Sequence, residues 1–423
     1  MGWLFLHLNF SRLNITGFIA NRIAFNQQKS FSRFIIRLSI AATVISVAVM
    51  IITLAFVNGF QEKVSEKVFS FWGHIRVQYK QPMKTAIAEE MPIEQNDSVA
   101  FAVKKNSQVQ SIHPFATKYA ILKTDEDMEG VLLKGLDSTY DYNHLKQFMQ
   151  EGRWLQFNDS TYSREIIIST FTANQLKLKL NDRLLIYFIR PDGSMRPDKL
   201  EIVGIYKTGI QEYDNAFAIG DLKLIQRLNS WESYEIGGYE IFLKDYSEMI
   251  PASLDIYEMD EFPQSWDTRI IKDIYPYIFD WLKMQDVTRN VLIAFMIIIA
   301  VINLITCLII LVLERLRMIG ILKALGASDW TVQKIFLKHS SIITIGGIIG
   351  GTLFALAIIY LQQETGFIKL KEEAYYLSEA AVKIVWWQVA AVCGGTLLVS
   401  YLVLMIPTYI VKKVQPVKAI RFR

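Results

Sequence analysis

Cysteine and histidine are scarce in this sequence, and the common nucleotide-binding and hydrolase motifs are missing. Of 423 residues only two are cysteines, Cys307 and Cys393, and both lie in apolar runs, so no disulfide can hold a polar domain together. None of the five histidines lies at metal-ligand spacing from another histidine, a cysteine or an acid. G-x-S-x-G and G-x-x-x-x-G-K-[ST] do not occur. We therefore predict no catalytic residue and no metal site, and any ATP must be bound by another subunit.

Long apolar runs dominate what is present. Hydrophobic residues make up 52% of the chain, its mean hydropathy is +0.24, and 20% of residues are charged. This mixture indicates apolar membrane spans combined with a polar domain. Runs long enough to cross a bilayer occupy residues 34–58, 289–313, 335–361 and 386–411. The first run is too long for the apolar core of a signal peptide, and no small-x-small cleavage pattern follows it, so we expect a retained helix.

The short polar segments indicate the orientation of these spans. Segment 1–33 has four Lys/Arg residues and no acidic residue. Segment 314–334 has four Lys/Arg and two acidic residues, and the tail 412–423 has five Lys/Arg and no acidic residue. Loop 362–385 has three Lys against four Glu, and 59–288 holds 26 basic and 35 acidic residues, a net of −9. Because basic residues concentrate in cytoplasmic loops, both termini and 314–334 are predicted to be cytoplasmic.

The fold class predicted is an α-helical membrane protein with four transmembrane helices and a large mixed α/β extracytoplasmic domain. This domain, 59–288, is inserted between the first and second helices and forms one domain or two small lobes. "EIIIST" (165–170), "RLLIYFI" (183–189) and "KLEIVGIY" (199–206) are typical of strands. "TANQLKLKL" (172–180) and "DLKLIQRLNSW" (221–231) are typical of short helices.

One turn region, "FIRPDGSMRPDKL" (188–200), joins two predicted strands. Proline and glycine there preset the backbone and favour a stiff, projecting hairpin. The residues that would form it are Arg190, Pro191, Asp192, Gly193, Met195 and Pro197. The pattern fits either an ordinary surface hairpin or a rigid arm that binds a partner.

The stretch "ERLRMIGILKALGAS" (314–328) lies between the second and third spans and has a helical repeat of its own. Met318, Ile321, Leu322 and Leu325 fall on one face, and Gly320, Lys323, Ala324 and Ala327 on the opposite one. Gly326 is expected to end the helix and Ser328 to cap the next. The apolar face would lie against the spans, and the small face would be free for a partner. A basic loop without a partner is the alternative.

These residues resemble the MacB/FtsX-type ABC transporter permeases. "ERLRMIGILKALGAS" is similar to the family's coupling helix, and "PTYIVKKVQPVKAIRFR" (407–423) is similar to its closing pattern. The resemblance implies contact with an ABC ATPase pair, which would bind ATP and Mg, while this chain binds no cofactor. The ATPase-coupling residues it implies are Glu314, Arg315, Arg317, Gly320, Leu322, Lys323, Leu325 and Gly326.

Other stretches resemble the lipoprotein-releasing permeases of the LolC/LolE kind within that superfamily. These are "VNGFQEKVSEKVFSFWGHI" (57–75) and "GIYKTGIQEYDN" (204–215), and the turn at 188–200 sits where the carrier-binding hook of LolC sits. The resemblance implies a non-catalytic, multi-pass permease of the bacterial inner membrane, with its large domain in the periplasm. The partners it implies are an acylated lipoprotein, a periplasmic lipoprotein carrier, membrane lipids and a second permease, either a copy or a paralogue, and no nucleic acid.

The spans themselves suggest two further sites. The first span has few polar side chains and so suits acyl chains, which we assign to Ile40, Val44, Val47 and Ile51. In the third span, Gly346 with Gly350 and Gly347 with Gly351 form close-packing faces, either within the chain or between two copies. Three alternatives remain open: peptide or drug efflux by a permease of the same fold, control of an external hydrolase without transport, and an enzyme of unrecognised chemistry.

Overall fold

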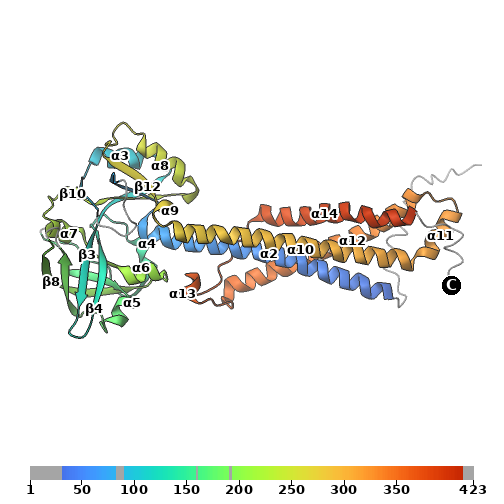
Figure 1. The fold of residues 1–423 in the computed structure, drawn as a ribbon, viewed down its shortest axis with the longest axis horizontal. Helices are drawn as coiled ribbons and strands as arrows, with labels where there is room; N and C mark the ends of the chain where they lie inside the picture. The colour runs from blue at the N-terminus through green and yellow to red at the C-terminus, as the bar shows by residue number, and fades with distance from the viewer. Residues whose placement is uncertain (1–30, 82–89, 159–160, 190–192, 413–423) are drawn as a thin grey trace, which may run out of the picture. The chain divides into compact units, whose positions relative to one another are not determined.

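The computed structural model describes residues 31–81, 90–158, 161–189 and 193–412, and divides into two compact units (Figure 1). The helical unit comprises Met1–Phe60, Met284–Ile368 and Ala380–Arg423. The sheet unit comprises Gln61–Lys283 and Lys369–Glu379. The predicted cytoplasmic segment 1–33 lies almost wholly outside the described residues, as does the basic tail 412–423.

The long helices are longer than the spans predicted from the sequence. They are α2 (Phe31–Trp72), α10 (Pro276–Glu314), α12 (Asp329–Thr365) and α14 (Trp386–Lys412). Among the described residues, α2, α10 and α12 are long and apolar enough to cross a membrane, and α14 contributes a shorter apolar stretch, Trp386–Leu402. At 1.5 Å per residue, the 42 residues of α2 extend for about 63 Å, roughly twice the hydrocarbon thickness of a bilayer.

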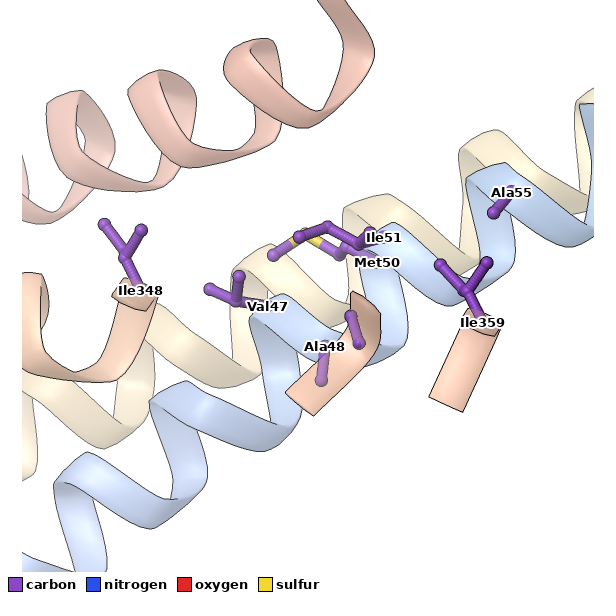
Figure 2. Close-up of a cluster of buried hydrophobic side chains, with 8 residues drawn as sticks. Val47, Ala48, Met50, Ile51, Ala55, Ile348 and Ile359 are labelled. Atoms are coloured by element: carbon purple, nitrogen blue, oxygen red, sulfur yellow. The ribbon is translucent and has the colours of Figure 1, made fainter. Parts of the chain in front are cut away.

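One hydrophobic core cluster of the helical unit lies where α2 packs on α12. Buried side chains of α2 meet buried side chains of α12 there (Figure 2), and they are Val47, Ala48, Met50, Ile51, Ala55, Ile348, Ala355 and Ile359. Short side chains such as Ala48, Ala55 and Ala355 allow the two backbones to approach closely. This helix pair therefore uses small residues at its interface, as membrane helices commonly do.

Ten strands of the described sheet unit pair into one mixed sheet, in the order β12-β1-β11-β3-β4-β9-β6-β8-β5. Strand β7 pairs with both β3 and β8, so the pairings β3-β4-β9-β6-β8-β7 return to β3 and form a closed circuit. The pairs β4·β9 and β6·β8 are parallel, and the other pairs are antiparallel. Closure leaves no free edge along this part of the sheet.

The strands of this unit are short except for β3 and β8. Their bounds are β1 Ile75–Tyr79, β2 Ile93–Glu94, β3 Val109–Lys123, β4 Met128–Leu136, β5 Met149–Gly152, β6 Glu165–Ser169, β7 Arg183–Ile189, β8 Met195–Tyr206, β9 Phe217–Asp221, β10 Glu235–Ile236, β11 Gly238–Leu243 and β12 Trp266–Ile270. The helices are α3 Asp97–Lys105, α4 Asn143–Lys146, α5 Thr170–Gln175, α6 Gln211–Ala216, α7 Leu222–Asn229, η1 Tyr246–Glu248, α8 Met249–Tyr257, α9 Ile271–Ile274 and α13 Glu372–Tyr375.

The structure confirms most of the local predictions. The three predicted strands are β6, β7 and β8, and Asp221 caps α7 by accepting the backbone N–H of Lys223 at 2.9 Å. The helix predicted over 172–180 is wrong at its end, because α5 stops at Gln175. Lys177 and Asn181 have left-handed φ values of 54° and 65°, which break the helical repeat.

Arg76, Lys134 and Glu240 form a group of charged side chains buried in the core of the sheet unit. Lys134 and Glu240 are fully buried, and the Lys134 ammonium donates to a Glu240 carboxylate oxygen at 2.9 Å. The Arg76 guanidinium lies 3.9 Å from Glu240 and 3.7 Å from the centre of the Trp72 ring. Burial lowers the pKa of Lys134 to about 8, although Glu240 opposes this shift.

The same lysine also holds the end of α2. The Lys134 ammonium donates to the carbonyl oxygen of Phe71, in the last turn of the helix, where the helix dipole favours a cation. Gly73 follows with a left-handed φ of 71° and donates its N–H to the Phe69 carbonyl at 2.7 Å. The carboxyl end of α2 is thus built into the core of the sheet unit.

Candidate functional site

The stretch predicted as a partner-binding helix forms α11, Leu316–Ala324. Gly326 has a φ of 92°, and Ser328 caps α12 by accepting the backbone N–H of Thr331 at 3.3 Å. A further ion pair of 2.8 Å joins Lys323 to Asp329 across the turn. The predicted end of the first helix and the predicted cap of the second are both confirmed.

The predicted buried face of α11 was right for Met318 and Leu322, which pack against a buried cluster of the spans, and wrong for Ile321 and Leu325. Ile319 and Gly320 are the buried residues, and Ile319 packs with Leu308, Val312 and Phe336. By contrast, Leu325 is 81% exposed and Ile321 is 47% exposed. Glycine at 320 presents no side chain, so this side of α11 can pack closely, whereas Ile321 and Leu325 are left outside.

An apolar surface therefore remains on α11 and the turn after it. Ile321, Leu325 and Trp330 are exposed, together with Ala324, Gly326 and the charged residues Glu314 and Arg317. Met318, Leu322, Lys323 and Arg315 are partly buried. We refer to Ile321, Leu325 and Trp330 as the α11 surface. Exposed apolar residues that lie together, with charges around them, are typical of a protein-binding surface.

The predicted arm is a β-hairpin formed by β7 and β8, whose pairs run from Arg183↔Glu201 to Ile189↔Met195. Arg190, Pro191 and Asp192 lie outside the described residues. Gly193 has a φ of 79°, with open space around its Cα, and Met195 is 60% exposed. Pro197, predicted in the turn, is paired with Tyr187 inside β8 instead.

Several apolar side chains lie on the outer face of the sheet near the turn of this hairpin. Ile189 pairs with Met195, and Ile121 of β3 pairs with Tyr187 of β7, so alternation along the strands places these side chains on one face. Tyr119 of β3 lies on the same face and is exposed, as are Ile189 and Met195. The described part of the hairpin thus carries exposed apolar side chains next to its turn.

The residues of α2 assigned to lipid contact lie differently from that prediction. Val47 and Ile51 are buried against α12, and Ile40 and Val44 are partly buried. The apolar residues that α2 exposes are Phe34, Leu38, Ala41 and Ile45, with the exposed Arg37 beside them. Their spacing of four, three and four residues makes one continuous stripe along the helix. Hydrophobicity alone could not separate the two faces, because both are apolar.

Three of the four glycines of the third span pack on α2. A Cβ added at Gly347 would lie 2.6 Å from the Thr43 side chain, and one at Gly351 would lie 2.7 Å from the Val44 carbonyl oxygen. A Cβ at Gly350 would lie 3.0 Å from Val44, whereas one at Gly346 meets nothing within 4 Å. The close-packing face is therefore used within the chain.

Replacing Gly351 with alanine should destabilise the helical unit by about 1–3 kcal/mol, the usual cost of an extra methyl group in a packed interface. The matched change, Gly346→Ala, adds the same methyl group to the open side of the same helix and should be neutral. Thermal unfolding of the full chain in detergent would compare the two variants. Equal melting temperatures for the two variants would contradict this packing.

Asn303 and Thr306 of α10 bond to a neighbouring helix and to their own helix, respectively. The Asn303 side chain donates to the Ser39 carbonyl oxygen at 3.1 Å and accepts from the Ser39 hydroxyl at 3.3 Å, which joins α10 to α2. Thr306 donates to the carbonyl of Ile302, one turn earlier in α10. Asn303 therefore serves as an interhelical hydrogen-bonding residue.

Comparisons with known proteins match both parts of the chain. The model of the MacB-like periplasmic core domain matches residues 38–245, and that of the FtsX-like permease C-terminal region matches 290–416. "Lipoprotein-releasing system transmembrane protein LolC" of Neisseria meningitidis serogroup B is 21% identical over 420 residues, covering 94% of this chain and 96% of that protein. The LolE protein of Haemophilus influenzae is 20% identical over 426 residues, covering 96% of this chain and 99% of that protein.

The chain is an ABC transporter permease of the LolC/LolE type. Among solved structures, the periplasmic region of MacB from Actinobacillus actinomycetemcomitans covers 48% of this chain and 91% of that one, with 11% identity and a TM-score of 0.34.

The structure of this LolC/LolE-type permease gives a physical reason for the "VNGF" stretch. A Cβ at Gly59 would lie 2.6 Å from the backbone of Val382, so glycine is needed for the segment before α14 to reach α2. Asn58 donates to the Gln388 side chain at 2.6 Å, and the Ala55 carbonyl accepts the N–H of Lys383 at 2.8 Å. These contacts hold the start of α14 against α2.

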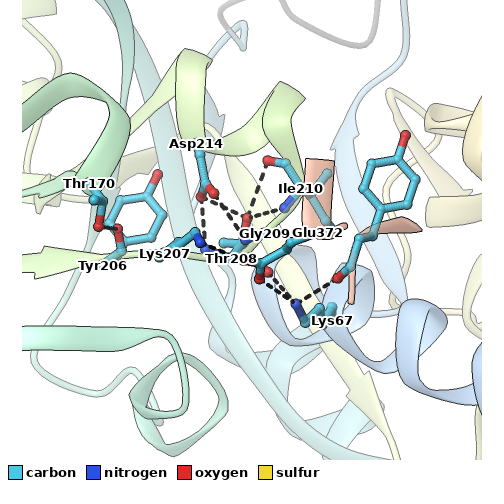
Figure 3. A network of polar contacts seen from close by, with 10 residues as sticks. Lys67, Thr170, Tyr206, Lys207, Thr208, Gly209, Ile210, Asp214 and Glu372 are labelled. Carbon is cyan, nitrogen blue, oxygen red and sulfur yellow. Dashed lines mark hydrogen bonds and ion pairs between the residues drawn. The ribbon is translucent and has the colours of Figure 1, made fainter. Parts of the chain in front are cut away.

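The "GIYKTGIQEYDN" stretch of this LolC/LolE-type permease forms a polar network in the sheet unit (Figure 3). Asp214 accepts the N–H and the hydroxyl of Thr208, each at 2.8 Å, and the N–H of Gly209 at 3.0 Å. Burial raises the pKa of Asp214, while these hydrogen bonds oppose the shift. Lys67 and Glu372 complete the network, and neither could be predicted from the sequence, because they are far apart along the chain.

Proposed function

We propose that this chain is the permease subunit of an ATP-driven ABC transporter that extracts lipoproteins from the outer leaflet of the bacterial inner membrane and passes them to a periplasmic carrier. The main support is the similarity, over nearly the whole chain, to proteins named as lipoprotein-releasing system transmembrane proteins. In this proposal four helices cross the membrane, both termini are cytoplasmic, and the sheet unit is periplasmic.

The α11 surface is the proposed docking site for the ATPase pair, which would bind ATP and Mg. The observation that supports it is the exposure of Ile321, Leu325 and Trp330, large apolar side chains that a partner would bury. Glu314, Arg315 and Arg317 at its start would add polar contacts. Gly320, Leu322 and Lys323 face inward and would instead hold α11 in place.

The hairpin is the proposed carrier site, and the exposed stripe of α2 is the proposed path for acyl chains. The exposed apolar side chains of Ile189 and Met195, next to the turn of the hairpin, support the first assignment. Pulling an acyl chain out of a bilayer costs about 0.8 kcal/mol per CH₂ group, so ATP and an apolar acceptor are both required. A second permease, either a copy or a paralogue, would complete the path.

Site-specific photocrosslinking in cells would test this proposal. A probe at Ile45, which is 58% exposed on α2, should capture an acylated lipoprotein, and a probe at Met195 should capture a small periplasmic carrier. The matched control is a probe at Val47, two residues away on the same helix but buried, which should capture neither. Adducts of Ile45 with peptides or small molecules in place of lipoproteins would overturn the proposal and favour an efflux permease.

A further inference from the structure

The connection between α12 and α14 contributes a piece to the sheet unit. Residues Lys369–Glu379 belong to that unit, while Ile368 before them and Ala380 after them belong to the helical unit. We call Lys369–Glu379 the latch segment. Its ends are joined by a strand-like bridge between Lys369 and Glu379, and it contains the single turn of helix α13.

Glu372 of the latch segment lies between two lysines from distant parts of the sequence (Figure 3). Its carboxylate forms an ion pair with Lys207, at the end of β8, and lies 3.6 Å from the ammonium of Lys67 on α2. The Glu372 side chain is only 24% exposed, so water screens these pairs less than it would on an open surface.

Lys67 adds backbone contacts to the same arrangement. Its ammonium donates to the carbonyl oxygen of Thr208 at 2.7 Å and to that of Tyr376 at 2.8 Å. Tyr376 also donates its hydroxyl to Glu212 at 3.3 Å and packs edge-on against Trp281. One ammonium group therefore joins α2, the loop after β8 and the latch segment.

The loop after β8 is shaped to receive the Glu372 side chain. Gly209 has a φ of 75°, and a Cβ there would lie 2.8 Å from the carboxyl carbon of Glu372. Only glycine both adopts this backbone and leaves room for the carboxylate. Asp214 fixes the loop through its bonds to Thr208 and Gly209.

We infer that Glu372 is a positioning residue for transport, which fastens the connection between α12 and α14 to α2 and to the loop after β8. Because α12 leads directly from α11, a movement imposed on α11 and α12 by the ATPase would reach the sheet unit through this latch segment as well as along α2 itself. Two lysines on one carboxylate give a contact specific enough to transmit such a movement. This inference rests on the proposed function.

The test compares Glu372→Gln with Glu373→Gln in the full transporter complex, reconstituted in vesicles with its ATPase. Glu373 is the neighbouring, exposed residue of α13, so its replacement removes the same charge without touching either lysine contact. For Glu372→Gln we expect basal ATP hydrolysis to stay near the wild-type rate and lipoprotein release to fall about tenfold, the middle of the range for coupling between sites. Hydrogen exchange of residues 207–214 should speed up by a similar factor. Glu373→Gln should match the wild type in all three measurements.

Two results would overturn the inference. One is wild-type release and wild-type hydrogen exchange in Glu372→Gln. The other is a loss of basal ATPase and of melting temperature together with release, since that would show a purely structural role. Gly209→Ala, which displaces the carboxylate from the other side, should reproduce the defect of Glu372→Gln. If the wild-type complex released no lipoprotein, the proposed function would fail, while the exchange comparison would still decide whether Glu372 holds the loop.

Discussion

Replacing Leu325 with aspartate should abolish coupling to the ATPase while leaving the chain folded. Leu325 is 81% exposed, so the change removes no packing within the chain. If a partner groove buries this side chain, its loss costs about 1.5–3 kcal/mol, and a carboxylate in the same groove adds a desolvation penalty. Together these effects should weaken binding of the ATPase by about 100-fold or more.

The measurement is ATPase affinity and lipoprotein-stimulated hydrolysis with purified permease. Leu325→Met conserves volume and should keep both near wild type. Gly320→Asp gives the informative contrast, because Gly320 is buried and a carboxylate there should lower the melting temperature of the permease itself. If Leu325→Asp kept wild-type stimulation of ATP hydrolysis by lipoprotein, the α11 surface would not be the docking site.

Replacing Glu240 with glutamine should destabilise the sheet unit by about 3–5 kcal/mol, the usual cost of leaving a buried charge without its partner. Glu240 is fully buried and is the anion beside both Lys134 and Arg76. Glutamine keeps the shape but removes the negative charge. The two buried cations, Lys134 and Arg76, would then repel each other without a neutralising anion. The carboxyl end of α2 should loosen as well, because Lys134 also binds the Phe71 carbonyl.

Thermal unfolding of the full chain in detergent measures this effect. For a domain of this size, the predicted loss corresponds to a fall of roughly 10 °C in melting temperature. Glu261→Gln is the matched control, since Glu261 is an exposed residue of the same unit and its replacement should change little. If Glu240→Gln had the same melting temperature as the control, the buried charges would not be what stabilises this core.

Several features of the candidate site could be predicted because they depend on residues close in sequence. The end of α11 at Gly326 and the cap at Ser328 are set by the chemistry of those residues. The hairpin of β7 and β8 was recognisable from two strand-like runs around a Pro-Gly turn, although Pro197 proved to lie inside a strand.

The faces of the helices could not be predicted in the same way. Periodicity correctly groups residues that share a face, but in a membrane protein the outer surface is as apolar as the core. Hydrophobicity therefore could not show that Val47 and Ile51 pack on α12 while Leu38 and Ile45 point outward. On α11 the buried side is formed by Ile319 and Gly320, and Ile321 and Leu325 are left exposed.

By itself the sequence determined the apolar spans, the mixed strands and helices between them, the local caps and the family to which the chain belongs. All of these follow from composition and from short motifs. The tertiary structure alone decided the buried group of Arg76, Lys134 and Glu240 and the contact of Glu372 with Lys67 and Lys207. The physical reason is that the sequence alone does not distinguish a charged residue exposed to solvent from one buried beside a partner. In these groups the partner lies more than a hundred residues away along the chain.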